Sequence, residues 1–522
     1  MLGEAYFFRI MKKIILLLVL GLLSTFSYSQ NYLNIRYNLD TINSYPRIKF
    51  LSFKEYNNTF YLLGEYWEEI MPSTYRLKSF ILNIDKFGNV NNRKDIDLNP
   101  GSYGDLIVIS DNGFAFAGSF YPDSLTFCRY YPHLDTTIMR YYHFAATNVY
   151  FEGRNILETS DNKFLLLGKQ YDYNNSTSKE YIIKTDSLGN ELWRRGYNMP
   201  TGIGYWCTPT AIFEANDGNY IALQTIRRYG QGNLAYEEVT SIEKVDTSGN
   251  GIWEYKTPIN RIIGAYDGLP TADNGVVFCG TVGEKVHAGV LYRGYIQKVD
   301  SLRQMEWEHI LGHPENSGLN DIEILSDGSY LASGFDVITY PDSVPINDSD
   351  SSRMMGWLVK IAPDGTKLWE RHHLKYNSHP LQHIINETHE MANGDLLSVG
   401  QNQTSIVTPG KWGWLIRTDS FGCIVPGCQL LDNTENISVI FDNEVTVFPN
   451  PASEVVKFRF EKAVQEGIIR VYSSLGQLID ETKIDYFNEV EMNVSDWNNG
   501  VYYYGIYVEG QLVKQGQVLV QN

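Results

Sequence analysis

The sequence predicts an all-β protein: a seven-bladed β-propeller followed by a small antiparallel β-sandwich. Two observations predict the propeller, namely a sequence unit that recurs seven times and the division of each period into four short strands. A third observation, a change of strand pattern after residue 443, predicts the sandwich.

Each repeat carries two markers. The first is a turn followed by an apolar run that ends in glycine, as in SDNKFLLLG at Gly168, and the second is an apolar strand followed by Asp, a turn glycine and often Trp, as in IIKTDSLGNELW at Trp193. Successive first markers are separated by 50 to 66 residues, a period typical of propellers and solenoids. Four strands per period favour the propeller. The first markers end at Gly64, Gly118, Gly168, Gln224, Gly280, Gly334 and Gly400.

The turns and the recurrent tryptophans fit this architecture. Turn sequences such as Asp111-Asn112-Gly113 supply residues that tolerate positive φ, which tight hairpins between twisted strands require. We interpret the tryptophans of the last strands as packing between blades rather than as a cofactor site. They are Trp193, Trp253, Trp307 and Trp369.

The N-terminal region predicts export and ring closure. Met11-Lys12-Lys13, the apolar run from Ile14 to Leu23 and the small residues before Gln30 have the pattern of a secretory signal peptide, residues 1–29, with Met11 as a possible start. That run is too short to span a bilayer, and no later apolar span follows. Asn31 to Asp40 resembles the fourth strand that the last repeat lacks. We therefore expect this segment to complete the last blade of a propeller spanning residues 30–428.

Composition restricts the partners. The chain has 522 residues, a formal charge of -18 and a pI near 5.0. Because phosphate binding requires a basic surface, nucleic acid is not expected as a partner. Of the five cysteines, Cys423 and Cys428 are the expected disulfide of an exported protein, with a metal pair as the weaker alternative. We expect Cys128, Cys207 and Cys279 to be buried, and the sequence does not say how they would pair.

A polar linker, residues 429–443, precedes a different domain. Residues 444–522 form short alternating strands with tight turns, which predict a small β-sandwich. This segment resembles the type A C-terminal sorting domain of the type IX secretion system, through VFPNP at Val447 to Pro451, IRVYSSLGQLI at Ile469 to Ile479 and VSDWNNGVYYYGI at Val494 to Ile506. The resemblance implies contact with the type IX machinery and export across the outer membrane to the cell surface or the medium. Its motif residues are Pro449, Asn450, Pro451, Gly476, Gly500 and Tyr502.

Catalytic or metal chemistry has little support in the sequence. His372, His373, His379, His383 and His389 crowd one region but spread over a strand, a loop and the next strand, so we interpret them as an uncommitted polar region. Asp348 and Asp350 lack the turn glycine and distal Glu of a calcium loop. No hydrolase, metalloprotease or phosphate-loop motif occurs. We therefore assign no catalytic residue, metal or cofactor, and the sequence leaves enzyme activity open while favouring a non-enzyme.

Three functions are consistent with these features. The leading hypothesis is a secreted or cell-surface propeller that binds a glycan or a surface protein, the second is a hydrolase or lyase acting on polysaccharide with carboxylates inside the ring, and the third is a structural surface protein. The first-to-second and third-to-fourth strand connections are tight turns, whereas the others, such as Lys169 to Lys179, are long. Recognition is therefore expected on the long-loop face. Its candidate ligand-binding aromatics are Tyr171, Tyr173, Tyr205, Trp206, Tyr229, Tyr292, Tyr340 and Trp412.

Overall fold

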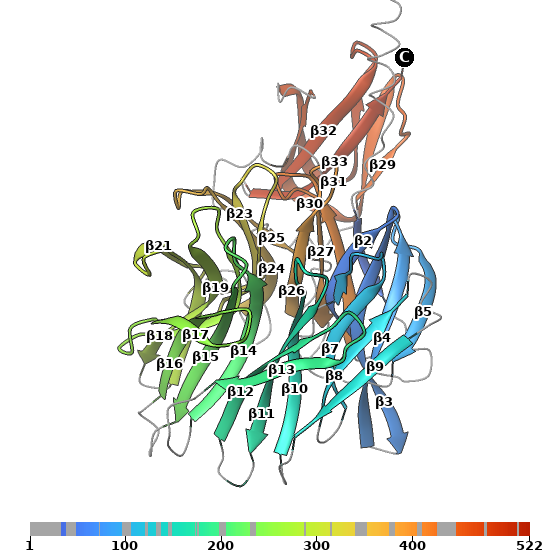
Figure 1. Ribbon diagram of the computed structural model, residues 1–522. Helices are drawn as coiled ribbons and strands as arrows, with labels where there is room; N and C mark the ends of the chain where they lie inside the picture. The colour runs from blue at the N-terminus through green and yellow to red at the C-terminus, as the bar shows by residue number, and fades with distance from the viewer. Residues whose placement is uncertain are drawn as a thin grey trace, which may run out of the picture. The chain divides into compact units, whose positions relative to one another are not determined.

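The computed structural model is built of β-strands (Figure 1). The described residues are 33–37, 48–71, 74–96, 106–120, 124–131, 137–144, 149–172, 174, 177–197, 205–229, 236–286, 289–313, 316–339, 352–374, 382–403, 410–424, 428, 445–473, 478–508 and 511–521. The expected signal peptide, residues 1–29, and the expected linker, residues 429–443, lie outside them.

Seven four-stranded antiparallel sheets, which we call blades 1 to 7, make up the described part of the ring. One residue pair, Met354 with Gln382, also bridges blades 6 and 7. The predicted all-β class and blade count are confirmed. The strands are, for blade 1, β2 (Ile48–Tyr56), β3 (Thr59–Met71), β4 (Thr74–Asp85) and β5 (Val90–Ile96); for blade 2, β6 (Leu106–Val108), β7 (Phe114–Phe120), β8 (Ser124–Tyr130) and β9 (Thr137–His143); for blade 3, β10 (Val149–Glu158), β11 (Phe164–Asp172), β12 (Thr177–Thr185) and β13 (Glu191–Tyr197); for blade 4, β14 (Tyr205–Glu214), β15 (Tyr220–Tyr229), β16 (Tyr236–Val245) and β17 (Gly251–Lys256); for blade 5, β18 (Ile262–Pro270), β19 (Val276–Val286), β20 (Gly289–Val299) and β21 (Met305–Leu311); for blade 6, β22 (Gly318–Ile324), β23 (Tyr330–Thr339), β24 (Ser352–Ile361) and β25 (Lys367–His373); and for blade 7, β26 (Gln382–Glu390), β27 (Leu396–Gln403), β28 (Lys411–Thr418) and the N-terminal β1 (Leu33–Tyr37).

The N-terminal strand closes the ring. β1 pairs antiparallel with β28, with Ile35 opposite Leu415. Its Tyr37 hydroxyl donates a hydrogen bond of 2.6 Å to the carbonyl of Gly88, which lies in the third turn of blade 1. The expectation that this segment supplies the missing fourth strand of the last blade is therefore confirmed, and the closure joins the two ends of the repeat array.

The first-marker residue lies opposite a β-bulge and is glycine in five of the blades concerned, with Gln224 at this position in blade 4. In six blades the marker residue pairs with the residue just before a bulge in the first strand, as Gly168 pairs with Gly153. A Cβ atom at Gly168 would lie 2.8 Å from the carbonyl oxygen of Glu152, so a larger residue would force the two strands apart. The recurrence of glycine at this position is thus explained by close backbone approach.

Polar residues of both markers tie the turns together. The Asp in the turn of the first marker forms an ion pair with a Lys or Arg of the third strand in the same blade, as Asp273 does with Lys298 at 2.6 Å. The marker Ser binds a glutamate that ends the first strand of the next blade. In blade 3, Ser160 donates from its backbone N and from Oγ to Glu214, each at 2.7 Å. Ser110 with Glu158 and Ser326 with Glu390 repeat this arrangement.

The recurrent tryptophans pack between blades. Trp193 Nε1 donates to the Thr247 carbonyl of the next blade at 3.1 Å, and its ring covers Gly249. Trp307 covers Gly365 and Trp369 covers Gly422 in the same way. These contacts support the packing interpretation of the repeat.

A seam of ionic groups joins blades 6, 7 and 1. Glu387 on β26 accepts the backbone N–H of Phe53 at 2.9 Å, and its Oε1 lies 2.6 Å from His389 Nε2 and 3.2 Å from Lys54 Nζ. His389 Nδ1 lies 3.3 Å from Glu323 Oε2. Burial would raise the pKa of Glu387, but Lys54 and His389 outweigh it and lower that pKa. The equivalent Asp321 accepts Thr388 N–H, so first-strand carboxylates hold successive blades together.

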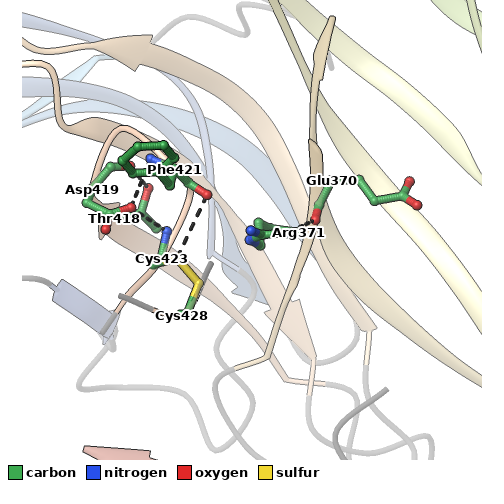
Figure 2. The surroundings of a disulfide bond; sticks show 7 residues. All are labelled: Glu370, Arg371, Thr418, Asp419, Phe421, Cys423 and Cys428. Atoms are coloured by element: carbon green, nitrogen blue, oxygen red, sulfur yellow. Dashed lines mark hydrogen bonds between the residues drawn. A yellow bond between two sulfur atoms is a disulfide. The ribbon is translucent and has the colours of Figure 1, made fainter. Parts of the chain in front are cut away.

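The cysteines match their expected roles. Figure 2 shows Cys423 bonded to Cys428, with the two Cα atoms 5.6 Å apart. The turn before the bridge is ordered by Asp419, whose Oδ1 accepts the backbone N–H of Phe421 at 2.9 Å and of Cys423 at 2.8 Å. Cys128, Cys207 and Cys279 are buried thiols that form no disulfide.

The C-terminal domain is a separate small β-structure. Its strands are β29 (Val445–Phe448), β30 (Val455–Tyr472), β31 (Leu478–Asn493), β32 (Gly500–Val508) and β33 (Gln511–Val520). Strand β31 pairs along both halves of the long β30, whereas β29 pairs with its first half and β32 with its second. Residues of both halves share one core, in which Phe458 contacts Tyr504 edge-on with the ring centroids 5.0 Å apart. This packing of two sheet halves is the predicted sandwich.

The PNP motif caps an edge of this domain. Asn450 Oδ1 accepts the backbone N–H of Leu519 at 2.8 Å, and its Nδ2 donates to the Gln517 carbonyl at 3.2 Å. The amide thereby bonds the outer edge of β33 as a neighbouring strand would, which blunts an edge open to other chains. The hydroxyl of Tyr502 donates to the Asn498 carbonyl at 2.8 Å. Gly500 begins β32, and Gly476 lies outside the described residues.

The ring has a tight-turn face and a loop face. The tight-turn face carries the connections of strands one to two and three to four, and the loop face carries the others. The expected long loops are shorter than predicted, because the second and third strands continue into them: within Lys169 to Lys179, β11 extends to Asp172 and β12 begins at Thr177. The polar residues that suggested loops are cross-strand pairs of extended hairpins.

Candidate functional site

Polar side chains gather on the loop-face half of several blades. Just beyond the marker position, the second strands change from apolar residues to buried polar ones. A core that needed only packing would continue with apolar residues here. This layer and the hairpins that extend from it on the loop face therefore form the candidate site region. Its members include Glu65, Thr225, Thr281 and Asn402.

Two predicted aromatics meet on this face. Tyr171 at the end of β11 and Trp206 at the start of β14 come from neighbouring blades, and their ring centroids lie 4.8 Å apart at 38°. Trp206 is 38% exposed although tryptophan is mostly buried in folded proteins. The two rings meet because both residues lie at the loop-face ends of their strands in neighbouring blades. The pair presents aromatic surface at the junction of blades 3 and 4.

Charged residues lie in blade 3, which also carries Tyr171. Lys169 pairs across the sheet with Glu152 on one side and with Glu180 on the other. Glu152 Oε2 lies 2.9 Å from Lys169 Nζ, and its Oε1 lies 2.8 Å from Arg154 Nη2. Burial would raise the pKa of Glu152, but Arg154 and Lys169 outweigh it and lower that pKa. A buried row of charges thus extends from the channel-lining strand β10 into the blade.

The pKa of Glu180 is shifted in the opposite direction to that of Glu152. Its side chain is 1% exposed, and burial together with the negative charge of Glu243 raises its pKa well above the usual range. Neither of its carboxyl oxygens has a hydrogen-bond partner among the described residues. The row therefore contains two carboxyl groups on either side of Lys169: Glu152, whose pKa is lowered, and Glu180, whose pKa is raised.

Blade 1 adds a further ion pair to this group. Lys49 Nζ lies 2.8 Å from Glu65 Oε2, and Glu65 is 1% exposed. Burial raises the pKa of Glu65, and the charge of Glu152 raises it as well, whereas the charge of Arg154 lowers it. Charged residues from blades 1 and 3 thus converge on the loop-face side of the ring.

Two other predicted aromatics with described side chains lie in other blades than the pair. Trp412 lies on β28 in blade 7, where the guanidinium of Arg36 stacks 4.3 Å from its ring centre, and Tyr292 lies on β20 in blade 5. The predicted aromatics whose side chains the structure describes are therefore spread over blades 3, 4, 5 and 7. Tyr205 begins β14 and Tyr229 ends β15, with undescribed side chains, and Tyr173 and Tyr340 lie outside the described residues.

The histidine-rich region divides into separate environments. His373 and His383 are buried at separate positions, and burial lowers the pKa of each to about 3. His389 belongs to the ionic seam at the other end of the first strands. His379 and the acidic pair Asp348 and Asp350 lie outside the described residues. In the part of the chain that the structure describes, no group of three His, Cys, Asp or Glu side chains is arranged to hold a metal ion.

His372 instead belongs to a cluster that sequence reasoning missed. Its Nε2 lies 2.9 Å from Oδ2 of Asp336, and His313 Nδ1 lies 2.8 Å from the same oxygen. The two histidines and the aspartate come from three different segments, so no local motif announces them. The available signal was Asp336 itself, an acidic residue two positions after the marker glycine in the otherwise apolar run GFDVI.

Taken together, the fold and the C-terminal domain define a β-propeller protein built for export. Residues 446–521 match the secretion system C-terminal sorting domain, so this segment is the type IX sorting domain that its motifs indicated. The chain is accordingly exported across the outer membrane to the cell surface or the medium. No helix among the described residues is long and apolar enough to cross a membrane.

Comparison with solved structures finds matches at low sequence identity. An ulvan lyase of polysaccharide lyase family PL25, bound to -[GlcA(1-4)Rha3S]-, is 8% identical with a TM-score of 0.47, covering 71% of this chain and 92% of that chain. The polysaccharide lyase Uly1 is 8% identical with a TM-score of 0.44, covering 76% and 93%. The β-propeller domain of the Trilobed protease from Pyrococcus furiosus is 9% identical with a TM-score of 0.40, covering 72% and 94%. No curated protein matches the chain. We carry no activity over from these structures.

Proposed function

We propose that the exported propeller is a glycan-binding module and that the Tyr171–Trp206 pair is its stacking surface. The observation that carries this proposal is the meeting of two aromatic rings from adjacent blades on the loop face, with Trp206 38% exposed. Amphipathic rings of this kind stack on the apolar faces of sugars while charged neighbours hydrogen-bond the hydroxyl groups. The neighbouring charged row, with Glu152 and Lys169, supplies such groups in blade 3.

A glycan array probed with the purified secreted protein tests this function. Wild type should bind a defined set of glycans, and Trp206→Ala and Tyr171→Ala should remove that binding without lowering the melting temperature of the ring. Phe87→Ala is the matched control, because Phe87 is 45% exposed in a turn of the tight-turn face. Binding that survives both loop-face changes, or binding only to a surface protein, would contradict the proposal.

A polysaccharide hydrolase or lyase is the second candidate. Glu152 and Glu180 favour it, because glycoside hydrolases pair an ionised carboxylate with a protonated one and these two groups have opposite pKa shifts. Burial and the Glu243 charge raise the pKa of Glu180, so Glu180→Gln is the test variant that keeps the shape of the side chain while removing its ionisable proton. Release of sugar products by wild type, with loss in Glu180→Gln and Glu152→Gln, would establish this function. A ring that neither binds nor cleaves any glycan would leave the third hypothesis, a structural surface protein.

Export and processing complete the proposal. We propose that residues 1–29 are removed as a signal peptide, that the propeller spans residues 30–428, and that the linker at 429–443 separates it from the sorting domain at 444–522. The basic and apolar pattern after Met11 and the sorting-domain match at 446–521 support this order. Mass spectrometry of the secreted protein should find an N-terminus at Gln30, and an N-terminus retaining Lys12 and Lys13 would contradict it.

A further inference from the structure

The link between blades 5 and 6 presents a histidine on the loop face. Ser317 donates its backbone N–H to the Tyr292 carbonyl at 3.0 Å, which fixes the end of the link on β20. Arg293 donates from Nη2 to the Gly312 carbonyl at 2.8 Å and from Nε at 3.2 Å. His313, the next residue, is therefore held over β23 while 47% of its side chain stays exposed.

Asp336, on β23, holds both histidines through hydrogen bonds. It is 1% exposed, and its Oδ1 accepts the backbone N–H of His313 at 2.9 Å and the hydroxyl of Ser317. Burial would raise its pKa, but hydrogen bonds from His372, Ser317 and the His313 backbone outweigh it and hold that pKa well below its usual range. The group is therefore an ionised carboxylate that can only accept hydrogen bonds.

This fixes the orientation of both imidazoles. Because Oδ2 accepts from His313 Nδ1 and His372 Nε2, each of these nitrogens carries a proton. The remaining nitrogens, His313 Nε2 and His372 Nδ1, point away from the carboxylate. His372 is also held by Trp357, whose ring lies parallel to it at 2° and 6.0 Å. A protonated imidazole in this cluster would offer its second N–H outward in a fixed direction.

We propose that His313 and His372, with Arg293 beside them, bind the anionic group of an acidic glycan, a uronate carboxylate or a sulfate ester. This inference deepens the proposed glycan binding and rests on it. The hydrogen bonds of Asp336 are satisfied inside the cluster, so the outward groups are nitrogens, and charge-assisted N–H donors are the preferred partners of carboxylate and sulfate. In a chain with a formal charge of -18, such a grouping of nitrogen donors stands out.

Binding at this site should strengthen as pH falls. Histidine side chains gain charge between about pH 8 and 5 in proteins. Among the described residues, the titratable or charged groups around the two imidazoles are Asp336 on β23, Tyr292 and Arg293 on β20, and Arg371 and His373 on β25 itself. Asp336, whose pKa is lowered, remains ionised over this range, so its charge does not change between the two ends of it.

Calorimetric titration with three oligosaccharide probes of equal length tests the inference: one neutral, one carrying glucuronate and one carrying sulfate esters. The acidic probes should bind at least tenfold more tightly at pH 5.5 than at pH 8, and His313→Gln with His372→Gln should remove that gain while neutral-probe binding is kept. The glucuronate and sulfate arms show which anion is preferred. His143→Gln, which changes an exposed histidine on β9, is the control and should keep the gain.

A second readout separates this inference from the proposed function. In histidine-labelled protein, the imidazole NMR signals of His313 and His372 should shift on addition of free glucuronate or sulfate, even in Trp206→Ala. Shifts in a protein that binds no glycan would sustain the anion site and refute the stacking surface. Absent shifts, or acidic-probe affinity that is equal at both pH values, would overturn the anion site whatever the aromatic pair does.

Discussion

The seam at Glu387 gives the sharpest test of how the ring is held closed. Glu387→Gln removes a buried carboxylate that accepts Phe53 N–H and balances His389 and Lys54. Removing one partner of a buried ion pair costs about 3–5 kcal/mol, because the remaining charges, here on Lys54 and His389 with side chains 25% and 26% exposed, lose their partner. For a cooperative ring of roughly 390 residues, an unfolding entropy of about 2.1 cal/mol/K per residue converts this cost into a melting temperature lower by about 4–6 °C.

The loss of stability caused by Glu387→Gln should depend on pH in a defined direction. Burial and the Lys54 charge would lower the pKa of His389, but Glu387 and Glu323 raise it to about 10. Its contribution to stability is therefore fully present below the ordinary histidine pKa of about 6.5 and is lost as pH rises toward 10. Glu387, whose pKa is lowered, contributes above the ordinary glutamate value and loses its contribution in acid. The penalty of Glu387→Gln should accordingly be larger at pH 6 than at pH 10.

Differential scanning fluorimetry of wild type and variant at these two pH values measures the effect. Glu370→Gln is the control, because Glu370 forms an exposed pair with Lys367 and such pairs contribute about 0–1 kcal/mol. Equal melting temperatures for wild type and Glu387→Gln at pH 6, or a penalty that grows with pH, would refute the role assigned to the seam.

Two further predictions concern closure and export. Deleting residues 31–40, which contain β1, should lower the melting temperature of the ring by more than Glu387→Gln does, because β28 and the third turn of blade 1 lose their partner; an unchanged melting curve would exclude closure by this strand. Deleting residues 444–522 should retain the protein inside the cell envelope in a fractionation experiment, and Asn450→Ala should lower the amount exported because the edge of β33 loses its cap, whereas normal secretion of the truncated chain would contradict the sorting role.

The repeat architecture could be predicted because its determinants are local. A marker glycine, a turn Asp and a strand tryptophan each act within a few residues or on the equivalent position one blade away, so the same short pattern recurs seven times. Even ring closure was visible, since Asn31 to Asp40 resembles a strand that the last unit lacks. The long loops were overestimated because hairpin residues such as Lys169 and Tyr171 are polar, although they pair across strands.

The candidate site could be predicted only in part. Tyr171 and Trp206 were both selected as loop-face aromatics, but their contact depends on which blades are neighbours and on the exact length of β11. His313, Asp336 and His372 are separated by 23 and 36 residues along the chain, and no spacing rule links them. Their meeting follows from the link between blades and from strand register, which the linear pattern does not contain.

The central claim, glycan binding at the aromatic pair, is tested most directly by one affinity measurement. Isothermal titration of the strongest array ligand into wild type, Trp206→Ala and Phe87→Ala compares two exposed aromatics on opposite faces. Truncating a central aromatic anchor costs about 2 kcal/mol or more, so Trp206→Ala should weaken binding at least tenfold while Phe87→Ala leaves it unchanged. Equal affinities for wild type and Trp206→Ala, or a loss confined to Phe87→Ala, would contradict the account.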